Sequence, residues 1–204
     1  VRILPRTTVY GAFDHGIYGA LERKTDHLAD ADGKPRQVLW RVYSQRAILC
    51  AGATERSIAF GNNDRPGIML AGAVRTYLNR FGVTPGKRVA VFTNNSSGLR
   101  TALDLEAKGV EVVRIVDTRV GDVVVDTSGR HGITAVSLNE SRRFTADCLA
   151  VSGGWSPNVH LACHHRGRPV WREDILAFVP GVDLPPGMSV AGAANGAMTL
   201  HGAL

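Results

Sequence analysis

A strand, a helix and a second strand follow one another between residues 88 and 117, and this alternation constrains the fold more than any other feature. The runs "RVAVF" and "VEVVRIVD" are largely apolar, as expected of strands buried on both faces of a parallel sheet. Four residues between them recur at helical spacing and mark the expected buried side: Leu99, Ala102, Leu103 and Ala107. Together these segments predict an α/β protein containing a βαβ unit.

The turn between the first strand and the helix, in "VAVFTNNSSG", lies where a dinucleotide-binding protein carries a glycine-rich loop. The three glycine positions of that fingerprint fall on Thr93, Asn95 and Gly98. Gly98 keeps the glycine that lets helix and strand pack closely, whereas the two glycines that face the phosphates are absent. Asn tolerates left-handed backbone, so the turn itself can form.

Two interpretations of this turn remain open. Asp117 ends the second strand about 20 residues further on, where an acidic residue binds the ribose hydroxyls, so the segment could be a weakened NAD site around Gly98 and Asp117. Alternatively, the βαβ unit is kept for architecture, with Asp117 a solvated residue at a strand end. We favour the second, because the phosphate cradle contributes most of the binding at such sites.

The segments before the βαβ unit predict a small antiparallel meander and a further helix. "TTVYGAF", "IYGALER" and "QVLWRVYS" are strand-like and are separated by turn signals, and "RAILCAGATER" reads as a buried strand. Asp64 is a plausible N-cap, with Pro66 in the first turn. Five residues are expected on the buried face of this helix: Leu70, Val74, Tyr77, Leu78 and Phe81.

Two later segments repeat the pattern of an apolar strand followed by a glycine turn. They are "DCLAVSGGWSPN" and the closing "MSVAGAANGAMTLHGAL". In the second, residues 192–196 place small residues at a strand-to-helix junction, where backbone N–H groups could face an anionic or ribose-rich ligand. A tightly packed Ala/Gly helix is the simpler alternative.

Composition excludes several classes of function. The net charge of +6 comes from scattered basic residues without a basic run, which argues against nucleic-acid binding. Neither a membrane-spanning stretch nor a signal-peptide pattern is visible, so we expect a cytoplasmic protein without membrane contact. The start at Val1, without a methionine, suggests a piece of a longer protein.

The cysteines and histidines do not form a recognisable site. Cys50 and Cys148 lie in apolar runs and are expected to be small buried residues. The cluster His160, Cys163, His164 and His165 has no matching ligand pair elsewhere, so no metal site is expected. We also find no arrangement of catalytic residues.

Four segments together resemble the alpha subunit of heterotetrameric sarcosine oxidase. They are "RTTVYGAFDH", "AGATERSIAFGNNDRPGIMLAGAVRTYLNRFGV", "FTNNSSG" and "LAVSGGWSPNVHL", and they cover most of the chain in the right order. The resemblance implies a Rossmann-like dinucleotide-binding domain of the glutathione-reductase type, inserted into part of a second one, with an antiparallel β-meander. The expected boundaries are 1–60 and 166–204 for the first domain and 61–165 for the inserted one.

The resemblance also implies the cofactors. The alpha subunit of this family carries NAD in its first domain, whereas FAD lies in the beta subunit and FMN at the interface between the two. By similarity, the residues of this chain at the NAD site are Val9, Ala193, Met198 and Leu200. Related flavoproteins have a Gly-Asp pair that binds a flavin-nucleotide hydroxyl, and Gly192-Ala193 replaces it here, which favours NAD over FAD.

The implied function is a share in the oxidative demethylation of sarcosine to glycine. Beta, gamma and delta subunits are the expected partners, and tetrahydrofolate accepts the one-carbon unit in a C-terminal domain that this chain lacks. The chain alone is expected to be inactive. Subunits of opine oxidases and dye-linked proline dehydrogenases share parts of the pattern and are the near alternatives. A further alternative is that the chain is a non-catalytic scaffold or docking domain.

Overall fold

The computed structural model describes residues 1–203; residue 204, the last of the expected return segment 166–204, lies outside them. The chain divides into two compact units, and unit 2, residues 55–155, lies in sequence between the two parts of unit 1, residues 1–54 and 156–204. The short strands β5 (Ala53–Glu55) and β13 (Trp155–Pro157) pair where the chain passes between the units.

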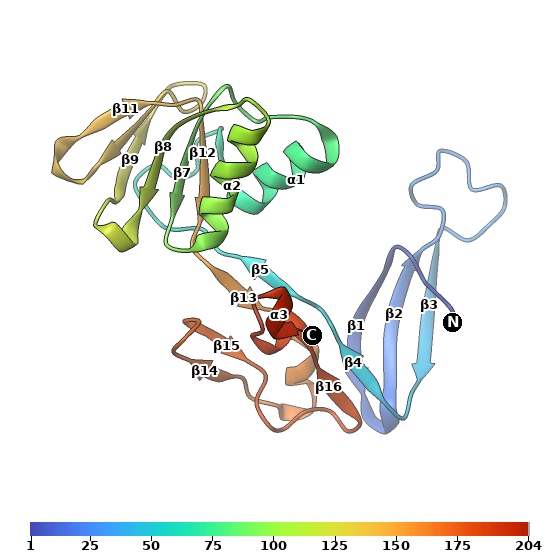
Figure 1. The fold of residues 1–204 in the computed structure, drawn as a ribbon. Helices are drawn as coiled ribbons and strands as arrows, with labels where there is room; N and C mark the ends of the chain where they lie inside the picture. The colour runs from blue at the N-terminus through green and yellow to red at the C-terminus, as the bar shows by residue number, and fades with distance from the viewer. Residues whose placement is uncertain (204) are drawn as a thin grey trace. The chain divides into compact units, whose positions relative to one another are not determined.

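Unit 2 is built on a parallel sheet of four strands in the order β6-β12-β7-β8 (Figure 1). The strands span β6 (Ile68–Leu70), β7 (Arg88–Thr93), β8 (Glu111–Asp117) and β12 (Cys148–Ser152). Two helices, α1 (Ala71–Phe81) and α2 (Ser96–Ala107), precede β7 and β8 in the chain. The predicted α/β fold with its βαβ unit is thereby confirmed.

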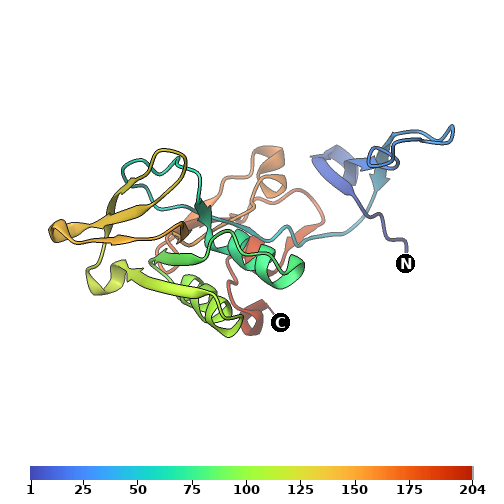
Figure 2. The ribbon, with the colours of Figure 1, turned by 90° about the horizontal axis from the view of Figure 1, so that it is seen from above.

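Alternate residues of the central strands face opposite layers, which explains their unbroken apolar sequence. Val89 and Val91 pack with α1 and α2 in one buried cluster. Ala90 and Phe92 belong to a second cluster on the other face. That face is covered by an antiparallel sheet of β9 (Val124–Ser128), β10 (Ala135–Leu138) and β11 (Arg143–Thr145), so unit 2 has three layers (Figures 1 and 2).

Unit 1 contains the predicted antiparallel meander and two pairs of short strands. The meander has the order β1-β2-β3 and comprises β1 (Thr7–Phe13), β2 (Ile17–Arg23) and β3 (Gln37–Tyr43). Strand β4 (Ala47–Leu49) pairs in parallel with β16 (Met188–Val190). Strands β14 (Val170–Arg172) and β15 (Ala177–Val179) form an antiparallel hairpin.

The remaining helical segments are short. They are the 3-10 turns η1 (Asp14–Gly16), η2 (Thr118–Val120), η3 (Asn139–Ser141), η4 (Leu161–Arg166) and η5 (Gly192–Asn195), and the terminal α3 (Leu200–Ala203). Within residues 1–203, no helix has the length and apolar character needed to cross a membrane.

The predicted start of the first helix is wrong. Residues 64–67 form a turn, Ile68–Leu70 form β6, and the helix begins only at Ala71. Leu70 therefore lies in a strand, as the N-cap of the helix and not on its buried face. Val74 and Leu78 are buried as predicted, whereas Tyr77 and Phe81 are exposed.

The predicted buried side of α2 is also partly wrong. Leu103 and Ala107 are exposed, and the buried residues are Gly98, Thr101, Ala102 and Leu105. Gly98 lies on the buried face because it packs closely against Thr93. Cys148 is buried as predicted, but Cys50 is exposed.

Candidate functional site

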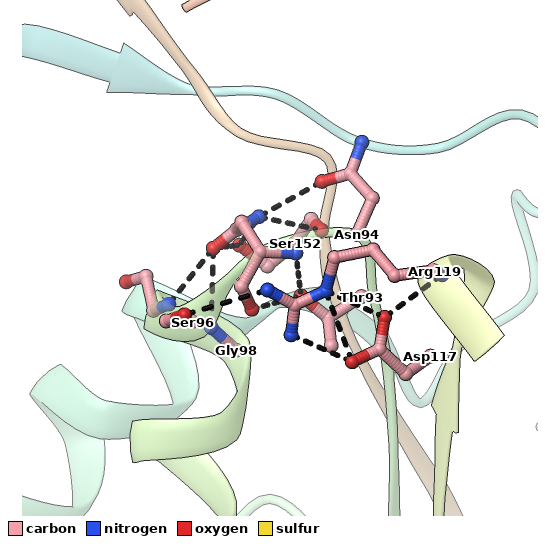
Figure 3. Close-up of polar contacts among 9 residues, drawn as sticks. Thr93, Asn94, Ser96, Gly98, Asp117, Arg119 and Ser152 are labelled. Atoms are coloured by element: carbon pink, nitrogen blue, oxygen red, sulfur yellow. Dashed lines mark hydrogen bonds and ion pairs between the residues drawn. The ribbon is translucent and has the colours of Figure 1, made fainter.

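The turn between β7 and α2 is closed by its own side chains (Figure 3). Asn95 is the N-cap of α2, and its Oδ1 accepts hydrogen bonds from the backbone N–H groups of Ser97 (2.9 Å) and Gly98 (3.3 Å). These are the donors that a helix N-terminus offers to a phosphate. A phosphate bound at these donors would therefore have to displace the Asn95 side chain.

The amide nitrogen of Asn95 fixes the side chain in this position. Its Nδ2 donates to the backbone oxygen and to Oγ of Ser152, both at 3.1 Å, at the end of the neighbouring strand β12. Asn95 has φ −150° and ψ 165°, which is extended backbone. The turn thus forms through capping, and the left-handed conformation that we expected of an Asn is not used.

Gly98 retains its packing role for a steric reason. A Cβ on Gly98 would lie 3.0 Å from Cγ2 of Thr93 and closer still to Oγ1 and Cβ. Thr93 is fully buried, and its hydroxyl donates to the backbone oxygen of Asn95 at 2.9 Å. The third position of the fingerprint therefore requires glycine, whereas Thr93 and Asn95 put side chains where the other two glycines would be.

The carboxylate of Asp117 is held by an arginine that the sequence analysis did not identify. Arg119 donates from Nη2 to Oδ2 of Asp117 at 2.6 Å and from Nε to Oδ1 at 2.9 Å. The guanidinium also reaches Oγ of Ser96 at 3.4 Å (Figure 3). The Asp117 side chain is only 14% exposed, so it is not the freely solvated strand-end residue of the architectural interpretation.

This contact favours the ionised form of both side chains. The hydrogen bond from Arg119 is the largest influence on Asp117 and lowers the pKa of its carboxyl below the ordinary value, although burial raises it. The same contact raises the pKa of Arg119. A ribose hydroxyl could bind Asp117 only in competition with this ion pair.

The residues expected at the NAD site all lie in unit 1. Val9 is on β1 and is exposed. Ala193 is in η5, and Met198 and Leu200 follow it, with Leu200 opening α3 and largely exposed. Gly192 has φ +67°, and the space that a Cβ would enter there is open. Ala193, Met198 and Leu200 therefore all lie in the closing segment of the chain, whereas Val9 lies on strand β1.

The histidine cluster has a structural role in unit 1. Nδ1 of His164 accepts the backbone N–H of Ala12 at 3.1 Å, and Nδ1 of His165 lies 3.4 Å from Oδ1 of Asp14. These contacts tie η4 to the β1 end of the meander. Among the residues that the structure describes, His, Cys, Asp and Glu side chains form no group of three or more that could hold a metal.

The three-layered unit 2 and the parallel β4–β16 pair define the class: an α/β protein with a Rossmann-like fold. L-proline dehydrogenase from P. horikoshii superimposes with a TM-score of 0.75 over 92% of this chain and 36% of that one, at 23% identity. No protein-family model matches the chain.

Sequence comparison gives the particular relationship. The chain is 42% identical to sarcosine oxidase subunit alpha of Rhizobium meliloti (strain 1021) over 212 residues, covering 95% of this chain and 21% of the relative. It is 39% identical to the same subunit of Corynebacterium sp. (strain P-1) over 232 residues, covering 98% and 24%. The predicted resemblance is confirmed: the chain is homologous to part of the alpha subunit of sarcosine oxidase, and it spans less than a quarter of these relatives.

Proposed function

We propose that the chain is the dinucleotide-binding region of a sarcosine oxidase alpha subunit. The observation that carries this proposal is the 42% identity to a sarcosine oxidase alpha subunit over nearly the whole chain. The complete enzyme would be a flavin-dependent amine oxidoreductase that demethylates sarcosine to glycine, with tetrahydrofolate as acceptor of the one-carbon unit. In this account the chain supplies a cofactor site and an interface, carries no catalytic residue and is inactive alone.

Unit 1 is the proposed NAD-binding unit. Val9, Ala193, Met198 and Leu200 are the proposed contacts, and the open space at Gly192 supports an approach of the ligand to the closing segment. Ala193 stands where related flavoproteins carry the aspartate of their Gly-Asp pair, which supports NAD over FAD. FAD would be bound by the beta subunit and FMN at the alpha–beta interface, with gamma and delta subunits completing the enzyme.

Unit 2 is proposed to stabilise the architecture without binding a dinucleotide. Asn95 already accepts from the N–H groups of Ser97 and Gly98, and Asp117 is paired with Arg119. Gly98 and Asp117, the residues of the weaker candidate site, therefore have structural roles in this proposal. Both residues lie in the inserted domain expected over residues 61–165, most of which belongs to unit 2.

Two alternatives have their own support. A subunit of an opine oxidase or of a dye-linked proline dehydrogenase is compatible with the fold, which an L-proline dehydrogenase shares. A scaffold or docking domain is supported by the closed turn around Asn95. The sarcosine oxidase proposal ranks first, because its alpha subunits are 39–42% identical to the chain whereas the L-proline dehydrogenase is 23% identical.

The test uses the complete enzyme assembled from all its subunits. Sarcosine-dependent formation of hydrogen peroxide and glycine is expected, with L-proline and opines as comparison substrates. A preference for L-proline with a dye as acceptor would replace the proposal with the dehydrogenase alternative. Denaturation of the alpha subunit should release one equivalent of NAD, which mass spectrometry quantifies. An alpha subunit that releases no NAD would favour the scaffold alternative.

A further inference from the structure

Two neighbouring parallel strands of unit 1 end in similar glycine turns. Strands β4 and β16 pair so that Leu49 lies beside Val190, and the backbone N–H of Ala191 donates to the oxygen of Leu49 at 3.0 Å. Gly52 follows β4 with φ +69°, and Gly192 follows β16 with φ +67°. Ligands of open α/β sheets bind outside the carboxyl ends of the strands. The segment after β4 therefore lies at the same edge of unit 1 as the closing segment, where NAD is proposed to bind.

Packing contributes little to the conformation of residues 50–53, which we call the β4 turn. Cys50 and Ala51 are exposed. Apart from the chain neighbours of Gly52, no described residue has an atom within 4 Å of the position that a Cβ on Gly52 would take. The left-handed φ of Gly52 is only one of several conformations open to a glycine. The turn therefore depends on hydrogen bonds for its shape.

Asn158 supplies three of these hydrogen bonds. Its Nδ2 donates to the backbone oxygen of Ala51 at 2.8 Å, and its backbone N–H donates to the oxygen of Gly52 at 3.0 Å. Its Oδ1 accepts the hydroxyl of Thr54 at 2.9 Å. All four residues belong to unit 1, although Asn158 follows the others by more than 100 positions in the chain. A single side chain with its own backbone thus fixes the β4 turn.

The position of Asn158 is itself fixed by the core of unit 1. Asn158 lies just before η4, whose Leu161 and Ala162 pack in one apolar cluster with Leu49 of β4 and Val190 of β16. The packed core that carries the two strands therefore also carries the asparagine. Asn158 connects an exposed turn to the rigid part of the unit.

Asn158 and Asn95 bind their turns in opposite ways. Oδ1 of Asn95 accepts from the N–H groups of Ser97 and Gly98 and thereby occupies the donors that a phosphate would need. Asn158 instead donates to carbonyl oxygens of the β4 turn and takes none of its N–H groups. One asparagine closes its turn to a ligand, whereas the other shapes its turn and leaves the donors of that turn to other acceptors.

The contacts of Asn158 also give the direction of one donor. The peptide between Ala51 and Gly52 is trans, so its N–H points opposite to its C=O. Asn158 binds that C=O, and the N–H of Gly52 is therefore directed away from Asn158. A backbone N–H at the carboxyl end of a parallel strand is a donor suited to the phosphate or ribose oxygens of a dinucleotide.

We propose that the N–H of Gly52 donates to an oxygen of NAD and that Asn158 is the positioning residue that directs it. The inference rests on the proposed function of unit 1 as the NAD-binding unit and adds a second wall to that site, opposite the closing segment. Asn158 does not touch the ligand. Its contribution is to hold the β4 turn in the binding conformation before NAD arrives, so that binding does not have to order a glycine turn.

The experiment measures the dissociation constant of NAD by equilibrium dialysis of the complete enzyme, assembled from all its subunits. Asn158→Ala should raise the dissociation constant about tenfold, because both side-chain hydrogen bonds to the turn are lost. Asn158→Asp keeps the acceptor for Thr54 but places a carboxylate oxygen against the carbonyl of Ala51, so it should bind NAD no better than Asn158→Ala. Thermal unfolding verifies that each variant is folded.

Two controls separate positioning from general stabilisation. Asn139 in unit 2 likewise donates from Nδ2 to a backbone oxygen, that of Gly121 at 2.9 Å, so Asn139→Ala should lower stability without changing the dissociation constant of NAD. Thr54→Val should weaken NAD binding by removing the hydroxyl that Asn158 accepts, whereas Thr54→Ser keeps the hydroxyl and should bind like the wild type.

Hydrogen exchange tests the contact at Gly52 directly. The amides of residues 51–53 should exchange more slowly in the complete enzyme with NAD than without it, together with those of residues 192–194. Protection of residues 192–194 alone would overturn the contact at Gly52. An unchanged dissociation constant in folded Asn158→Ala would overturn the positioning role.

The outcomes distinguish this inference from the proposed function. A wild-type enzyme that binds NAD as tightly as Asn158→Ala does contradicts only the inference. A wild-type enzyme that binds no NAD contradicts the proposed NAD site, and the inference with it.

Discussion

Gly98 and Thr93 are in such close contact that no side chain fits between helix α2 and strand β7. We predict that Gly98→Ala destabilises the protein by about 1–3 kcal/mol, the usual cost of overpacking, despite the higher helix propensity of Ala. The free energy of unfolding in urea measures this effect.

The double variant Thr93→Gly/Gly98→Ala is the control for that prediction. It moves the glycine to the other side of the contact, so the two substitutions should destabilise less together than the sum of their separate effects. Simple additivity would show that the contact between the two residues is not the cause.

Asn95 is predicted to stabilise unit 2 as a helix cap. Asn95→Ala removes the acceptor for Ser97 and Gly98 and should reduce the free energy of unfolding by about 0.5–2 kcal/mol. Asn95→Asp retains the acceptor but loses the donor to Ser152, so an intermediate loss is expected. Equal stability of Asn95→Ala and the wild type would contradict the capping role.

The pair of Asp117 and Arg119 is predicted to make stability depend on pH. The pKa of Asp117 is lowered in the folded state, so the pair stabilises the fold above the unfolded pKa, about 3.9, and this stabilisation is lost as the pH falls through the folded pKa. Arg119→Gln should therefore be less stable than the wild type at pH 7, with a difference that shrinks in acid.

Urea unfolding at pH 7 and at successively lower pH measures that difference. Lys108→Gln removes one positive charge from an exposed position at the end of α2 and serves as control. A difference between Arg119→Gln and the wild type that persists unchanged in acid would contradict the ion-pair explanation.

The cysteines are predicted to react very unequally. Burial raises the pKa of the Cys148 thiol to about 12, whereas Cys50 is exposed. Because the thiolate is the reactive form, iodoacetamide should label Cys50 in the native protein and Cys148 only after unfolding. Mass spectrometry of labelled peptides checks this, with denatured protein as the fully labelled reference. Rapid native labelling of Cys148 would show that the core of unit 2 opens.

The sequence predicted the βαβ unit because strands β7 and β8 are long, apolar and separated by a regular helix. It failed at β6, whose three residues run directly into α1 and carry no turn signal between strand and helix. Tyr77 and Phe81 have helical spacing, but their exposure depends on how α1 lies on the sheet, which periodicity alone does not determine.

The closed turn could be predicted only in part. Asn95 directly before an amphipathic helix is a readable N-cap signal, and its side chain, more than its backbone conformation, is what the turn uses. Arg119 follows the strand end by two residues, and nothing in its spacing shows that it pairs with Asp117. Ser152 is brought to Asn95 by the parallel pairing of β12 with β7, a contact between distant parts of the chain.

The most direct test of the closed turn is an NMR titration of the protein with NAD. We predict that the amide resonances of Ser97 and Gly98 do not shift. The side chain of Asn95 already accepts hydrogen bonds from their N–H groups, and Arg119 already pairs with the carboxylate of Asp117. Asn95→Gly serves as the variant that opens the turn. Saturable shifts at Ser97 and Gly98 of the wild type would contradict the account and make unit 2 a dinucleotide site.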